Sequence, residues 1–141
     1  MDRLETVSLT METMWLMSIQ APEEDAERLM ATVQGIVPLA MGAYDGNAFQ
    51  SAAGVERYRP RAGAAAGEEQ EIRKRPGVVC VAFELPDDRA LLGRVAEAVF
   101  QAHSYQEPVI RLQPILASRS RGLDDRGNPN RWWNTSGDWK K

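Results

Sequence analysis

The sequence is poor in the residues that build metal sites and disulfides. Cys80 is its only cysteine and His103 its only histidine among 141 residues. One cysteine excludes a disulfide within the chain, and a catalytic zinc usually takes three protein ligands, commonly histidine or cysteine. We therefore predict no cofactor. His103 is the only plausible metal ligand, so a divalent metal would need a site shared between subunits or one made of carboxylates alone.

A strong net charge and long apolar runs are also missing. The formal net charge is only −3, which gives no overall attraction for nucleic acid. No stretch approaches the roughly 20 apolar residues of a membrane span, and residues 1–5 lack the apolar run of a signal peptide. Cys80 lies in the apolar run 78–83, which is typical of a buried side chain rather than a reactive thiol. We expect a cytoplasmic protein with no nucleic-acid or membrane partner.

What is present fits one domain, because 141 residues with an apolar share of 43% can form a single hydrophobic core. Residues 13–20 are apolar on both sides, as in a central strand. Pro22 then opens a helix whose apolar residues recur at three- and four-residue spacing. Residues 78–85 form the strongest strand. A second helix follows, with Asp87 as its expected N-cap, and residues 109–116 supply another strand.

The middle and the beginning of the chain are less regular. Within residues 42–60, Phe49 and the run 55–59 indicate two short strands, which we interpret as a hairpin joined around Gly54. Residues 61–77 read as a loop and residues 1–12 as an irregular, flexible leader.

This order of elements predicts an α+β fold of the ferredoxin-like βαββαβ kind. We expect a domain over residues 13–117, with a four-stranded antiparallel sheet, both helices on one face and an extra hairpin. Because the strands are apolar on both sides, the second face of the sheet needs cover. A homo-oligomer would provide it.

The composition changes at residue 118. Residues 118–141 carry six basic and three acidic residues, a net charge of +3, whereas residues 1–117 have a net charge of −6. This C-terminal tail contains Trp132, Trp133 and Trp139. We expect these tryptophans to pack on the acidic body or on a neighbouring subunit. The alternative is a docking segment for another protein, because tryptophan and arginine dominate interface hot spots.

Two motifs within residues 13–116 carry a family resemblance. The first combines Gly42, Asp45, Phe49, Gly54, Tyr58-Arg59-Pro60 and Gly63, and the second is Ala102-His103-Ser104-Tyr105-Gln106-Glu107-Pro108. Together they resemble the small domain of the NGG-interacting-factor-three-like family (the YqfO type), and the second is also similar to the closing motif of the CutA divalent-cation-tolerance proteins.

The resemblance implies a ferredoxin-like fold related to CutA and GlnB-like signalling proteins, which commonly form trimers. It implies no settled activity. Ser104 stands where that family usually has proline, and Gln106 replaces the first glutamate of its motif, which removes one carboxylate. The family's larger metal-binding domain has no counterpart here, so its metal chemistry is not carried over.

The candidate site centres on His103, Tyr105 and Glu107. His103 ends the second helix, where the helix dipole favours a charged imidazolium, and Glu107 could hydrogen-bond to it. Such a pair, with the Tyr105 phenol, could hold an anion or a metal or move a proton. The structural alternative is that His103 caps the helix end while its neighbours fix the turn.

A second cluster of candidate ligand-binding residues lies in the predicted hairpin. Its members are Tyr44, Asp45, Phe49, Arg57, Tyr58 and Arg59. Arg59-Pro60 has a structural interpretation, with Pro60 ending the strand, but Arg59 could also pair with Asp45 or bind a carboxylate or phosphate.

Three functions remain open on the sequence alone. The first is an oligomeric module that binds a small ligand or regulates a partner, with a homotrimer favoured. The second is an accessory subunit of a larger enzyme, docked through the tail tryptophans. The third is a small enzyme that uses His103 and Glu107 as an acid/base pair. Because no nucleophile or phosphate-binding glycine loop accompanies that pair, binding is favoured over catalysis.

Overall fold

The computed structural model describes residues 4–122 and 127–134. It contains one antiparallel sheet and two α-helices. The strands that precede the two helices end at Pro22 and Pro86. In chain order the elements are β1 (Leu4–Glu5), β2 (Leu9–Pro22), the 3-10 helix η1 (Glu23–Asp25), α1 (Ala26–Gln34), β3 (Phe49–Gln50), β4 (Gly54–Tyr58), β5 (Arg73–Pro86), α2 (Arg89–Ala102), β6 (Val109–Ser120) and the 3-10 helix η2 (Trp132–Asn134).

The sheet confirms the predicted ferredoxin-like α+β fold, with six strands rather than four. β2 lies between β5 and β6, while β3 and β4 both pair with β5 and β1 pairs with β2. All of these pairs are antiparallel. The two additional pieces, β1 and β3, are only two residues long, which is too short to show a hydrophobic period in the sequence.

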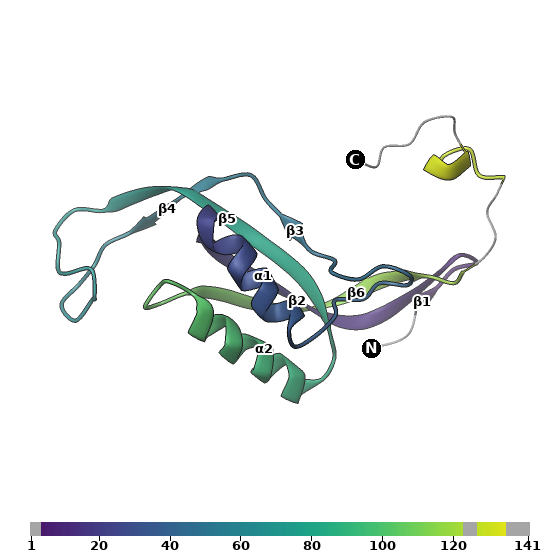
Figure 1. Cartoon of the computed structure of the whole chain (residues 1–141), viewed down its shortest axis with the longest axis horizontal. Helices are drawn as coiled ribbons and strands as arrows, with labels where there is room; N and C mark the ends of the chain where they lie inside the picture. Colours follow the sequence, from purple (N-terminus) through teal and green to yellow (C-terminus); the bar gives the residue numbers. More distant parts are fainter. Residues whose placement is uncertain (1–3, 123–126, 135–141) are drawn as a thin grey trace.

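Both helices cover the same face of the sheet (Figure 1). Alternate residues of β2 and β5 point toward them, as the two-residue period of a strand requires, and the apolar stripes of α1 and α2 close the core from below. Each fully buried aliphatic side chain contributes roughly 1.5–3 kcal/mol to folding. The core contains Met17, Ile19, Val79, Val81, Phe83 and Leu85 from the sheet and Leu29, Val33, Leu92, Val95 and Val99 from the helices.

The start of α2 differs from the prediction by one residue. Asp88, not Asp87, is the N-cap, and its carboxylate accepts the N–H of Leu91 at 3.2 Å. Asp87 accepts instead from the indole Nε1 of Trp15 at 2.8 Å. The two adjacent carboxylates therefore divide their roles, one for the helix end and one for the neighbouring strand.

The expectation of an irregular segment before residue 13 is wrong for the described residues. β2 begins at Leu9 and β6 continues to Ser120, so the two strands pair from Leu9 with Ser120 up to Gln20 with Val109. This end of the strand pair is largely exposed. Without a buried face it shows no alternation of apolar and polar residues.

The predicted hairpin between Phe49 and the 55–59 run is also wrong, because β3 and β4 lie end to end along β5. Ser51 keeps the chain on that edge: its N–H donates to the carbonyl of Cys80, and its hydroxyl accepts the Cys80 N–H, both at 2.9 Å. The hairpin that does form joins β4 to β5 through the loop of residues 59–72.

Candidate functional site

The turn after α2 is organised around the ring of His103. This residue is the C-cap of α2 and is 8% exposed. Its Nδ1 accepts the backbone N–H of Tyr105 at 3.1 Å, and its Nε2 lies 2.7 Å from the backbone carbonyl of Gln20 on β2. An acceptor role for Nδ1 and a carbonyl at Nε2 together require the neutral ring with its proton on Nε2. Both nitrogens are therefore used to fix the turn to the sheet.

Glu107 does not contact His103 in this arrangement. Both ring nitrogens of His103 have backbone partners, and the Glu107 side chain is exposed. The geometry is closer to the structural alternative but differs from it in two ways: His103 bonds to the neighbouring strand β2 rather than to the last carbonyls of its own helix, and Glu107 is exposed rather than fixing the turn.

Ser104 links the same turn to the first helix. Its hydroxyl donates to the Asp25 carboxylate at 2.5 Å, and Asp25 also pairs with the Arg28 guanidinium at 3.0 Å. Arg28 in turn donates to the carbonyl of Ala102 at 3.1 Å. Burial of Asp25 opposes its ionisation, but the Ser104 hydroxyl and Arg28 outweigh it and lower the pKa of Asp25. Ser104 thus has a structural role in joining the turn to the first helix.

Tyr105 extends from the turn to the β4–β5 hairpin. Its phenol donates to Glu56 Oε1 at 2.7 Å, and the Arg75 guanidinium lies 5.3 Å from the centre of its ring. Burial, followed by the hydrogen bond to the Glu56 carboxylate, raises the pKa of Tyr105 well above its usual value. With the Gln20 amide turned to satisfy its neighbours, it donates to Glu56 Oε2 at 3.1 Å and accepts from Arg111 at 2.9 Å. Four elements therefore meet in one hydrogen-bonded chain.

Gln106 fixes the position of the 59–72 loop. Its Oε1 accepts the N–H of Ala65 at 2.7 Å, and its amide N–H₂ faces the carbonyl of Gly63 at 3.5 Å. At the base of the loop, Arg73 pairs with Glu69 and also donates to the Tyr58 hydroxyl. The glutamine amide can both accept and donate here, which an ionised carboxylate cannot do.

These contacts enclose a cleft of about 740 Å³ between the β4–β5 hairpin and the turn after α2. Its volume falls within the range of small-molecule sites. The charged residues on its walls are three arginines and two glutamates: Arg57, Arg75, Arg111, Glu56 and Glu107. Much of the remaining lining is apolar or neutral, and it includes Val55, Pro60, the alanines at 64–66 and Val109.

The second predicted cluster is divided between two parts of the sheet. Tyr44 and Asp45 precede β3, whose Phe49 pairs with Ala82, whereas Arg59 follows β4, whose Tyr58 pairs with Arg73. Nine residues of β5 separate those two pairing positions, or roughly 30 Å at 3.3 Å per residue. The predicted pairing of Arg59 with Asp45 is therefore wrong, and neither residue lines the cleft.

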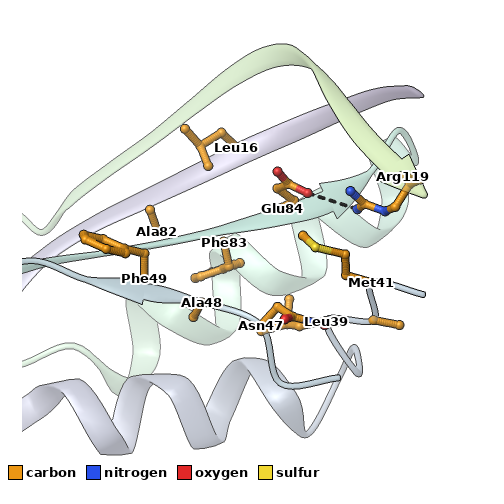
Figure 2. A pocket seen from close by; sticks show the side chains of 11 residues that line it. Leu16, Leu39, Met41, Asn47, Ala48, Phe49, Ala82, Phe83, Glu84 and Arg119 are labelled. Atoms are coloured by element: carbon orange, nitrogen blue, oxygen red, sulfur yellow. Dashed lines mark hydrogen bonds and ion pairs between the residues drawn. The ribbon is translucent and has the colours of Figure 1, made fainter. Parts of the chain in front are cut away.

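Near Tyr44 and Asp45 there is a smaller, mainly apolar groove of about 310 Å³. Figure 2 shows Phe49 beside Ala82 at its mouth and Met41 beneath the ion pair of Glu84 with Arg119. That pair is 3.0 Å long, with both side chains partly buried. Phe49 and Tyr44 are 72% and 67% exposed, so an apolar rim lies open beside the groove.

The tail is described only in part. Trp132 and Trp133 belong to η2 and contact each other edge to face, with ring centres 6.0 Å apart, and Trp133 is 50% exposed. Trp139 lies outside the described residues.

Sequence reasoning identified the turn but missed most of the cleft. Glu56, Arg75 and Arg111 come from three strands, and only the register of the sheet brings them to Tyr105. The sequence signal for this wall was the concentration of arginines in 57–75, part of which lies in the segment 61–77 that was predicted to be a loop.

Across residues 4–122 and 127–134, no group of three or more His, Cys, Asp or Glu side chains is placed to hold a metal ion. In the same part of the chain, none of the helices has the length and apolar character needed to cross a membrane. The predicted metal at a subunit interface involves more than one chain and stays a prediction.

No protein-family model and no curated protein sequence matches this chain. Solved structures do. A Bacillus cereus protein related to NIF3 aligns with a TM-score of 0.63 and 20% identity, over 77% of this chain but only 27% of its own. The periplasmic divalent cation tolerance protein CutA from Archaeoglobus fulgidus aligns with a TM-score of 0.51 and 20% identity, over 74% of this chain and 84% of its own.

The divalent cation tolerance protein CutA1 from Thermus thermophilus is similar over 82% of this chain and 90% of its own, with a TM-score of 0.52 and 16% identity. The chain therefore spans about a quarter of the NIF3-related protein and most of each CutA protein. At these identities the likeness concerns the fold. The resemblance predicted from the two motifs is confirmed at that level: the chain has the fold of a CutA/NIF3-like ferredoxin-like domain.

Proposed function

We propose that this protein is an oligomeric regulatory module that binds a small molecule in the cleft beside Tyr105, and that this binding is its regulatory signal. The observation that supports it is the cleft of about 740 Å³, whose walls come from β4, the 59–72 loop and the turn after α2. A hydrogen bond from Ala65 to Gln106 holds the loop in place, so the cavity has a defined shape.

The state of His103 favours binding over catalysis. General acid/base work needs a ring nitrogen within reach of a substrate proton. Both nitrogens of His103 are engaged with backbone groups, and the ring is 8% exposed. The alternative of a small enzyme with a His103–Glu107 pair would require the turn to open first.

The proposed oligomer uses a second copy of the chain to cover the apolar groove and its rim. Phe49 lines the groove and is 72% exposed, and exposed apolar patches mark sites of protein–protein contact. The related fold of CutA-like proteins favours a trimer. The half-exposed Trp133 supports the second candidate, an accessory subunit docked through the tail.

The test of the binding function uses the full chain purified from its native host. Native mass spectrometry should detect one small molecule retained per subunit, chemically unchanged after incubation. Val55→Trp, which places an indole in the cleft, should abolish retention, whereas Val7→Trp should not, because Val7 is 80% exposed and does not line the cleft. Conversion of the molecule would instead favour the small enzyme. Absence of any retained molecule, also after incubation with a host metabolite extract, would overturn the proposed function.

A further inference from the structure

The charged residues that line the cleft carry a net positive charge, because three arginines stand against two glutamates. Arg57 on β4 stands directly opposite Lys74 on β5. Directly opposed residues on antiparallel strands have Cβ atoms about 4.5–5.5 Å apart, and like charges at that position are destabilising. In the part of the chain that the structure describes, the side chain of Arg57 makes no hydrogen bond or ion pair. The positive charge of Arg57, which lines the cleft and faces Lys74 across the strands, therefore has no acidic partner among the described residues.

The glutamate nearest to this pair in sequence cannot supply it. Both carboxylate oxygens of Glu56 point to other partners, Oε1 to the Tyr105 phenol at 2.7 Å and Oε2 to the Gln20 amide at 3.1 Å. Arg75 lies over the Tyr105 ring, and its other neighbour, Glu24, is 4.0 Å away. Of the two glutamates on the cleft wall, Glu56 is therefore already bound and Glu107 is exposed, and two carboxylates do not balance the three arginines that line the cleft.

Arg111 adds a third donor at the opposite wall. Within residues 4–122 and 127–134, the hydrogen-bond partner of its guanidinium is the carbonyl of the Gln20 amide, a neutral acceptor, at 2.9 Å. A guanidinium carries five N–H donors in a planar fork, which matches carboxylate and phosphate oxygens. Arg57, Arg75 and Arg111 all line the same cavity, whose remaining walls include Val55, Pro60 and Val109.

We propose that the cleft binds an organic anion, in which a carboxylate or phosphate group is attached to a small apolar body. The anionic group is held by Arg57 and Arg111, and the apolar body packs against the valine, proline and alanine side of the cavity. This proposal rests on the proposed binding function and adds the chemical class of the ligand.

The test uses four probes with the full-length protein: benzoate, phenyl phosphate, inorganic phosphate and benzamidine. Benzamidine has nearly the shape of benzoate but the opposite charge, and inorganic phosphate lacks the apolar body. Binding is followed by amide chemical-shift changes of residues 55–66 and 104–111 at constant ionic strength. We expect saturable binding of benzoate, phenyl phosphate or both, with at least about tenfold weaker binding of inorganic phosphate and of benzamidine. The stronger of the two aromatic anions identifies the carboxylate or phosphate source.

Two variants assign the binding to the arginines. Arg57→Gln should weaken the better aromatic anion at least about tenfold, because it removes a charge-assisted contact. Arg94→Gln is the matched control: Arg94 is exposed on α2 and does not line the cleft, so the affinity should change less than twofold. Equal binding of benzamidine, an unchanged affinity in Arg57→Gln, or no shift with any probe would overturn the anion proposal. The proposed function is judged separately, by retention of a native small molecule.

Discussion

The side chain of Gln106 joins the turn after α2 to the Ala65 backbone in the loop between β4 and β5, across a hydrogen bond of 2.7 Å. The two residues lie 41 positions apart in the sequence. One exposed glutamine thereby sets the position of the loop that walls the cleft.

Gln106→Leu should loosen this loop without unfolding the domain. Because the side chain is exposed, we expect a loss of global stability below about 1 kcal/mol. Hydrogen exchange of the amide of Ala65 should rise at least tenfold, since its acceptor is removed. Gln101→Leu, which breaks only a contact with Glu97 on α2, serves as the control. Unchanged exchange at Ala65 would show that other contacts hold the loop.

The sequence predicts the central elements because their side chains repeat with a clear period. The strand 78–85 and the apolar stripe of α2 lie against the core. Their buried residues are therefore apolar and recur in a regular pattern that the sequence shows. The end of β2 near Leu9 has no buried face, and β3 has two residues. Neither could be found by periodicity. Ser51 illustrates a further limit. Its hydrogen bonds to Cys80 keep the chain along β5 instead of letting it turn back. Contacts between residues so far apart in the sequence cannot be predicted from the neighbouring residues.

In the candidate site too, one part could be predicted from the sequence and another could not. His103, Ser104, Tyr105 and Gln106 are adjacent, so one motif was enough to single them out. Their partners Asp25, Glu56 and Ala65 lie 79, 49 and 41 residues away from the turn residues that they contact. Those pairings depend on sheet register and loop closure, which residue types and spacing do not encode.

Tyr105→Phe tests the link between the turn and the hairpin. Loss of the hydrogen bond to Glu56 should lower the free energy of unfolding by about 1–2 kcal/mol near pH 8. The pKa of Tyr105 is raised in the folded protein, so this stabilisation is complete below the ordinary phenol pKa of about 10 and declines as the pH rises above it. Urea unfolding of both proteins at pH 8 and pH 10.5 measures the difference.

A spectroscopic titration provides the second readout for Tyr105. The absorbance at 295 nm of the wild type minus that of Tyr105→Phe reports this phenol alone. The difference should stay near zero at pH 10, where an ordinary tyrosine is half ionised. A midpoint at pH 10 would contradict the buried, carboxylate-bonded phenol.

Asp25→Asn tests the contact between the two helices. The carboxylate is 5% exposed and accepts from Ser104 and Arg28, so its neutralisation should cost about 1–3 kcal/mol at pH 7. The pKa of Asp25 is lowered in the folded protein, and its contribution is therefore present above about pH 4 and lost as the pH falls below that value. Urea unfolding at pH 7 and pH 3 should show the two proteins converging in acid.

The control for Asp25 is Asp45→Asn, because Asp45 is exposed in the loop before β3. That substitution should change the free energy of unfolding by less than about 0.5 kcal/mol at either pH. An equal effect of the two substitutions would mean that net charge, and not the contacts of Asp25 with Ser104 and Arg28, determines the acid sensitivity.

Phe49→Asp tests the surface that the second copy is proposed to cover. Phe49 is 72% exposed at the mouth of the groove, and burying a phenylalanine contributes roughly 1.5–3 kcal/mol to an interface. A carboxylate at this position would have to be desolvated close to Glu84, which also lines the groove. Size-exclusion chromatography with light scattering at micromolar concentration should therefore show a trimer for the wild type and smaller species for Phe49→Asp. Phe100→Asp, on the outer side of α2 and 47% exposed, should remain trimeric. A monomeric wild type would refute the proposed oligomer. An intact Phe49→Asp trimer would instead show that the interface lies on another surface of the domain.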